Sequence, residues 1–231
     1  MSSPPAGPVQ VAFCPCPPLL LPQVAGRAAA DTAALRAACA DAVDALLAAR
    51  PEVVVLVAPD AEGRYGPGDG GDLRGFGVDV VVPLAGGVRP GGRRVPPGLT
   101  VGAWLLAEAG HAGARIGVGP GELADVVAGL AGPVAVLALG DGSARRSLKA
   151  PGHLDDAAAP FDAAVAAALA AGDAAALAAL DAAEGERLMA AGVPVWRAVG
   201  ALLAGREVTG RLLADEAPFG VGYLVAAWSA S

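Results

Sequence analysis

The chain has 231 residues with 23 acidic and 16 basic side chains, which gives a net charge of −7 at neutral pH. This balance disfavours broad nucleic-acid binding, which needs a basic face. No run of about 20 strongly apolar residues occurs, so we expect no membrane span. The three cysteines form no disulfide framework, and we expect no secretory signal. The chain is therefore predicted to be cytoplasmic, with no nucleic-acid or membrane partner and with homo-oligomer formation left open.

Short apolar runs, several of them continuous and rich in β-branched residues, predict buried strands. They lie at residues 9–13, 53–57, 78–82, 116–118 and 135–139. Residues 1–8 are predicted to be a disordered tail, and the Gly/Pro-rich segments 61–75 and 84–98 to be long loops.

Helical segments alternate with these strands. They are predicted at residues 24–50, 99–109 and 119–130, and in a block over 158–204 broken at Gly172 and at 192–194. Two further strands, 208–213 and 221–228, are predicted to form a terminal antiparallel pair. This order predicts a three-layer α/β/α sandwich around a mostly parallel sheet.

The stretch over residues 135–153, AVLALGDGSARRSLKAPGH, is the most site-like part of the sequence. Ligands of open α/β sheets bind just beyond the carboxyl ends of the strands, and here a buried strand runs into a polar glycine-rich loop. Backbone N–H groups near Ser143, with Arg145 and Arg146, are candidates for binding phosphate. His153 is the only histidine placed near this strand end; the alternative is a solvent-facing loop histidine.

Two further polar residues, Cys16 and Asp60, each follow a predicted strand and lie next to a proline. Their strand ends are expected to converge with the loop after residue 139 at one crevice. Thiolates and carboxylates can bind metals, so Cys16 and Asp60, with His153 as a candidate third ligand, are one interpretation. A pocket wall and a turn-forming aspartate are the alternative.

Five segments occur in an order and spacing typical of one known family. CPCPPLLLP at 14–22 is similar to that family's Pro-His-Pro-Pro opening, and VVVLVAPD at 53–60 to its strand ending in Ser-Pro-His. LALGDGSARR at 137–146 is similar to its Ser-Asp-Leu-Ser-His segment. FDAAVAAALAAGD at 161–173 and PFGVGYLVAAW at 218–228 match its next helix and its closing Gly-Tyr strand. Over nearly its whole length the chain thus resembles the class III extradiol ring-cleavage dioxygenase superfamily, which includes the Memo-type proteins.

The resemblance implies a mononuclear Fe(II) site made of two histidines and a carboxylate, with a further histidine as acid/base. Cys16 and Asp60 match the two histidine positions, and Ala144 matches the acid/base position. Asp141 and Ser143 still match the family pattern. The resemblance therefore predicts the family scaffold with a degenerate metal site.

The third metal-ligand position of the family falls near Ala191, or within 193–196, where the similarity is loose. No residue there completes the family's donor set. We therefore expect residues 9–231 to form a single dioxygenase-like domain that is catalytically silent and that binds a small molecule or a protein partner, with no cofactor. The predicted pocket residues are Cys16, Asp60, Asp141, Ser143, Ala144, Arg145 and His153.

Two alternative functions stay open. One is a metal-dependent oxidoreductase or hydrolase with a Cys16/Asp60/His153 site that holds Fe(II) or zinc. The other is a phosphate- or nucleotide-binding protein that uses Ser143, Arg145 and Arg146.

Overall fold

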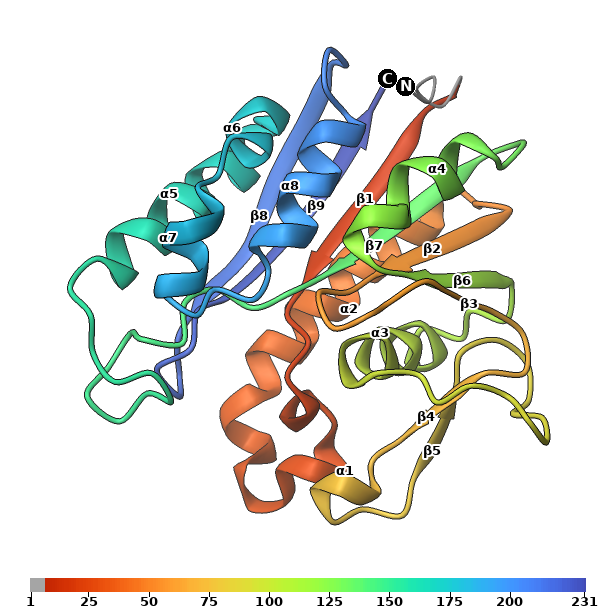
Figure 1. Cartoon of the computed structure of the whole chain (residues 1–231), viewed down its shortest axis with the longest axis horizontal. Helices are drawn as coiled ribbons and strands as arrows, with labels where there is room; N and C mark the ends of the chain where they lie inside the picture. The colour runs from red at the N-terminus through yellow and green to blue at the C-terminus, as the bar shows by residue number, and fades with distance from the viewer. Residues whose placement is uncertain (1–6) are drawn as a thin grey trace.

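The computed structural model describes residues 7–231 and has a seven-stranded sheet at its centre (Figure 1). The strand order across the sheet is β3-β6-β2-β7-β1-β9-β8. In chain order these strands are β1 (Val9–Cys14), β2 (Val53–Val57), β3 (Arg64–Tyr65), β6 (Ala114–Val118), β7 (Val134–Leu139), β8 (Val208–Glu216) and β9 (Tyr223–Ala230). The predicted tail over residues 1–8 lies outside the described residues except for its last two positions.

Four neighbouring strands of this sheet, β6, β2, β7 and β1, are parallel. Strand β7 is in the middle, where Val134 pairs with Val53 on one side and with Val9 on the other. All six residues of β7 are buried, as expected for a parallel strand covered on both faces. The carboxyl ends of β2, β7 and β1 therefore lie side by side at one edge of the sheet.

Helices cover both faces of the sheet, so the molecule has the predicted three layers (Figure 1). Helices α2 and α3 pack on the face that carries Leu56 and Leu137, whereas α4, α5, α6 and α8 pack on the face that carries Val55 and Val136. The helices are α1 (Pro22–Ala25), α2 (Ala33–Ala48), α3 (Pro97–Glu108), α4 (Leu123–Ala128), α5 (Ala158–Ala171), α6 (Ala174–Ala178), α7 (Ala182–Arg187) and α8 (Val193–Leu202). Short 3₁₀ segments lie at Pro18–Leu20, Gly26–Thr32, Arg74–Phe76 and Pro120–Glu122.

The predicted terminal strand pair is confirmed and joins the central sheet. Strand β9 is antiparallel to both β8 and β1, with Phe13 opposite Ala226. Trp228 on β9 stacks edge-on against Phe13 at a centroid distance of 4.8 Å, and its indole Nε1 donates a 2.7 Å hydrogen bond to the Leu169 carbonyl. Because β9 runs opposite to β1, its first residue lies at the edge where β1 ends.

Of the strand predicted at 78–82, only the last two residues lie in a strand. The observed strand is β5 (Val81–Pro83), and it pairs with β4 (Gly70–Asp72) in a separate two-stranded sheet. This hairpin packs on α3 so closely that a Cβ at Gly71 would lie 1.8 Å from Thr100 Oγ1. A glycine-rich segment without apolar alternation gives little sequence signal for a strand of this kind.

Two predicted helices are interrupted. The segment predicted as one helix over 24–50 is helical as α1, a 3₁₀ segment and α2, although Leu35 and Cys39 are buried on α2 as predicted. In the block over 158–204, the break at Gly172 is confirmed, where φ is +70°. An unpredicted break precedes α7, where the Asp181 carboxylate accepts a 2.9 Å hydrogen bond from the Ala183 N–H. No helix within residues 7–231 has the length and apolar content needed to span a membrane.

Candidate functional site

Three adjacent strand ends bring Cys16, Asp60 and Asp141 to the same edge of the sheet. Cys16 follows β1, Asp60 follows β2, and Asp141 follows β7, which lies between them. The Cys16 backbone N–H donates a 2.8 Å hydrogen bond to Asp141 Oδ1. The same two segments are also joined by a 3.0 Å hydrogen bond that the Gly140 N–H donates to the Cys14 carbonyl. The central strand thus holds its carboxylate against the segment that leaves β1.

Burial and, to a smaller extent, neighbouring charges raise the pKa values of Asp141 and Cys16 at this edge. Desolvation raises the pKa of Asp141 to about 6; the Cys16 N–H opposes this rise, and the charge of Asp60 adds to it. Desolvation also raises the pKa of the Cys16 thiol well above its usual value, with further contributions from Asp141 and Asp60. Both side chains keep some exposed surface, but the protein atoms packed around them are enough for desolvation to dominate. Cys16 is therefore a neutral thiol at pH 7 and not a ready nucleophile.

Asp60 contacts the start of a helix. Its Oδ2 accepts a 2.9 Å hydrogen bond from the Gly98 N–H in the first turn of α3. A Cβ at Gly98 would lie 2.7 Å from Asp60 Oδ1, so glycine allows this close approach. A carboxylate is favoured at a helix N-terminus, and the exposed Asp60 stabilises the start of α3 from outside the helix.

The sequence did not reveal Tyr223 as a neighbour of Cys16 and Asp141. Tyr223 begins β9 and is buried, and its pKa is raised by desolvation and then by the charges of Asp141 and Cys16. The antiparallel direction of β9 brings Tyr223 to the carboxyl edge of β1. Only the pairing of β9 with β1 could have revealed this, because Tyr223 and Cys16 lie near opposite ends of the sequence.

Ser143 and Arg146 lie in a buried network instead of facing a pocket. The Ser143 N–H donates to Asp162 Oδ1 over 2.9 Å, and its hydroxyl donates to the Leu188 carbonyl over 2.7 Å. Arg146 Nη1 donates to Asp162 Oδ2 over 2.8 Å. Ser143 and Asp162 are fully buried. These polar groups are therefore used to fix the loop on α5 and α7.

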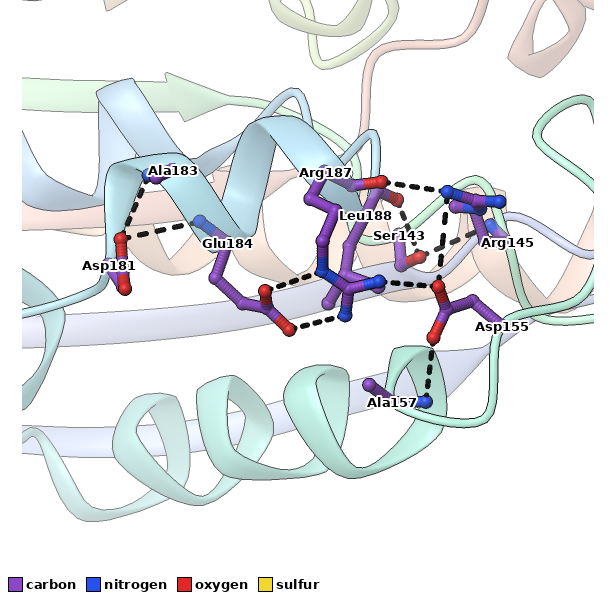
Figure 2. A network of polar contacts seen from close by, with 9 residues as sticks. All are labelled: Ser143, Arg145, Asp155, Ala157, Asp181, Ala183, Glu184, Arg187 and Leu188. Carbon is purple, nitrogen blue, oxygen red and sulfur yellow. Dashed lines mark hydrogen bonds and ion pairs between the residues drawn. The ribbon is translucent and has the colours of Figure 1, made fainter.

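The Arg145 side chain also contacts other residues of the protein, as Figure 2 shows. Its Nη1 donates to the Arg187 carbonyl over 3.0 Å and lies 3.9 Å from Asp155 Oδ2. Arg187 in turn pairs with Asp155 and with Glu184, so the charges of α7 and the loop compensate one another (Figure 2). This internal pairing of the arginines gives the predicted phosphate site no support from geometry.

Ala144 and His153 belong to the same loop, Ala144 partly buried and His153 exposed. The Ala144 carbonyl accepts a 2.9 Å hydrogen bond from the Gly152 N–H. His153 is exposed, and its Nδ1 lies 3.0 Å from the Leu148 carbonyl. Among the described residues, neither forms a hydrogen bond or ion pair with Cys16 or Asp60.

The donor set at the strand ends does not fit the iron site that the resemblance implies. Cys16, Asp60 and Asp141 supply a neutral thiol and two carboxyl groups but no imidazole. His111 follows the far end of α3, and His153 is engaged within its own loop. Within residues 7–231, no three His, Cys, Asp or Glu side chains are grouped as metal ligands. We therefore derive no chemical step through iron at this edge.

A cavity of about 550 Å³ adjoins this edge. Pro59, next to Asp60, forms one wall, and residues of the segment from the start of α7 into α8 form the rest, including Met189, Val193 and Arg197. The lining is mostly apolar, with Glu186 and Arg197 as its charged residues. Sequence reasoning missed this cavity because it depends on how α7 and α8 pack against the end of β2.

Known protein families offer no assignment for this chain: no family model matches it, and no curated protein does. The resemblance to the extradiol dioxygenase superfamily therefore stays a prediction.

Proposed function

We propose that the chain is a dioxygenase-like protein without ring-cleaving activity, and that it binds a small molecule at the carboxyl edge of its sheet. The observation that carries this proposal is the combination of two features at one edge. The strand ends hold carboxyl and thiol groups with no imidazole, and Pro59 after β2 lines a mostly apolar cavity.

The polar residues at the strand ends support the absence of ring cleavage. Ring cleavage by the family mechanism needs two neutral imidazoles, a carboxylate and an acid/base. Here Cys16 is a neutral thiol and the Asp60 carboxylate is hydrogen-bonded to the start of α3. The methyl group of Ala144 cannot carry a proton.

The cavity supports the binding role. Small-molecule sites are concave and mostly apolar, and volumes of roughly 300–1,000 Å³ are typical. At about 550 Å³ the cavity beside Pro59 falls in that range. In open α/β sheets, binding crevices lie beyond the carboxyl ends of the strands, where this cavity lies.

The proposal is tested by metal analysis of the full chain, purified without chelator, together with oxygen uptake in the presence of catechol. We expect substoichiometric iron and no catechol-dependent oxygen uptake, also after anaerobic loading with Fe(II). Stoichiometric iron with catechol turnover would overturn the proposal. Bound zinc that is lost in Cys16→Ala would instead favour the metalloenzyme alternative.

A matched pair of variants tests the predicted resemblance itself. The Cys16→His/Asp60→His double variant restores imidazoles at the two matching positions, and Cys16→Ala/Asp60→Ala removes the donors there. We expect Fe(II) binding to be measurably tighter in the double-histidine variant than in the double-alanine variant. Equal binding by the two would contradict the assignment of these positions.

A further inference from the structure

The cavity beside Pro59 has walls suited to a saturated hydrocarbon chain. Its ten lining residues include alanine, glycine, valine, proline and methionine, but no aromatic side chain on which a planar ring could stack. Met189 is about half exposed, and its flexible thioether can adapt to an irregular apolar ligand. The lining therefore favours an aliphatic body over an aromatic one.

One cation in this lining has unused binding capacity. Arg197 on α8 is half-buried, and its guanidinium donates one hydrogen bond, from Nη1 to the Leu180 carbonyl over 2.7 Å. Within residues 7–231 it forms no ion pair. A guanidinium has five N–H donors in a fixed planar arrangement that suits a carboxylate. Arg145 and Arg146, by contrast, each lie within ion-pair distance of a carboxylate of the protein.

A carboxylate in the same lining limits the charge of the ligand. Glu186 on α7 is exposed, lines the cavity, and forms no ion pair in the described part of the chain. A ligand with a second negative group would add a further like charge to a lining that already holds Glu186, or would have to bury that group against apolar walls. A ligand with a single carboxylate on an apolar body can pair with Arg197 without that added repulsion.

We propose that this cavity binds an aliphatic monocarboxylate, with its chain against Val193 and Met189 and its carboxylate on Arg197. This inference rests on the proposed binding role and adds the chemical class of the ligand. It requires no reaction, and the ligand leaves unchanged.

The test is calorimetric titration of the full chain with octanoate, octanol and octanedioate. We expect octanoate to bind with one site per chain and at least about tenfold more tightly than octanol, because a charge-assisted pair contributes more than a neutral contact. Octanedioate is expected to bind more weakly than octanoate because of Glu186. Equal binding of octanoate and octanol, or no binding of octanoate, would overturn the proposed ligand class.

Three variants distinguish the contribution of the Arg197 charge to ligand binding from that of the apolar cavity. Arg197→Gln should weaken octanoate binding by about tenfold and leave octanol binding unchanged, whereas Arg197→Lys should keep part of the preference for octanoate. Ala191→Phe, at an exposed lining position, should block both compounds. Arg27→Gln, at an exposed arginine outside the cavity, is the matched control and should change neither.

The outcomes distinguish this inference from the function on which it rests. If octanol binds as tightly as octanoate and Ala191→Phe blocks both, the cavity binds apolar molecules and only the carboxylate assignment fails. Iron-dependent catechol turnover would overturn the proposed function whatever the titrations give.

Discussion

Two neighbouring parts of the loop after β7 differ in how their polar groups are satisfied. Ser143 and Arg146 share the fully buried Asp162, and each has partners inside the protein. Asp141, at the start of the loop, lies among Asp60, the Cys16 thiol and Tyr223, and its carboxylate accepts a hydrogen bond from the Cys16 N–H. The first arrangement fixes the loop, whereas the second leaves like charges close together at a strand edge.

This difference shows why residue type alone is a poor guide to a site. An arginine pair after a glycine-rich turn is typical of anion binding, yet here both arginines are paired with carboxylates of the protein. Polar groups that are fully paired internally contribute to stability, whereas groups that are desolvated and close to like charges are candidates for function.

The largest effect is expected from removing Asp162, the carboxylate that Ser143 and Arg146 share. Asp162→Ala should lower the free energy of unfolding by about 3–5 kcal/mol, because it leaves the Ser143 N–H and the Arg146 guanidinium without their buried partner. Urea unfolding of the variant and of the parent measures this. Asp162→Asn keeps an acceptor for Ser143 and should cost less.

A variant of an exposed helix cap serves as the reference for this loss of stability. Asp173→Ala removes the carboxylate that accepts a hydrogen bond from the Ala176 N–H, and should cost about 1 kcal/mol. If Asp162→Ala costs no more than Asp173→Ala, the buried network does not fix the loop as described.

A smaller, pH-dependent effect is expected at Asp141, at the start of the loop. The pKa of Asp141 is about 6 in the folded chain, above its usual value of 3.8, so the folded state binds the proton more tightly than the unfolded state. Stability should therefore fall as the pH rises from 4 through 6. Asp141→Asn should remove this cost and stabilise the chain at pH 7.5 by about 1–2 kcal/mol, after allowance for the solvent that reaches the half-buried group.

Urea unfolding of the parent and of Asp141→Asn at pH 5 and pH 7.5 tests this. The other titrating groups are the same in both proteins, so their contribution cancels when the two free energies of unfolding are subtracted. A stability difference that is the same at both pH values would contradict the raised pKa of Asp141.

The smallest effect concerns the reactivity of one thiol. Cys14 and Cys39 are buried, whereas Cys16 is half-buried, so Cys16 should be the first to react with iodoacetamide in the native chain. Its rate should be slow at pH 7 because the pKa of the thiol is raised by burial and by Asp141 and Asp60. Asp141→Asn should increase this rate a few-fold. Labelling followed by peptide mass spectrometry measures both the site and the rate, and preferential labelling of Cys39 would refute the description of this edge.

Local sequence patterns were sufficient to predict the layers of the fold and the strands at its centre. The run Val53–Val57 was predicted at its observed bounds, and the buried run before Gly140 was predicted to within one residue. Continuous β-branched and apolar runs bounded by proline and glycine carry their own signal for buried strands. The order of these runs along the chain was enough to predict the three layers.

Which polar residues meet became clear only from the folded chain. The strand order brings Cys16, Asp60 and Asp141 together with Tyr223 at one edge, and it also packs α7 and α8 into a cavity next to Pro59. Strand order and helix packing depend on contacts between residues far apart in the chain, and local periodicity carries no information about them. For the same reason the sequence could not tell that Arg146 is paired internally while Arg197, in the predicted helical block, is left without a charged partner in the described chain.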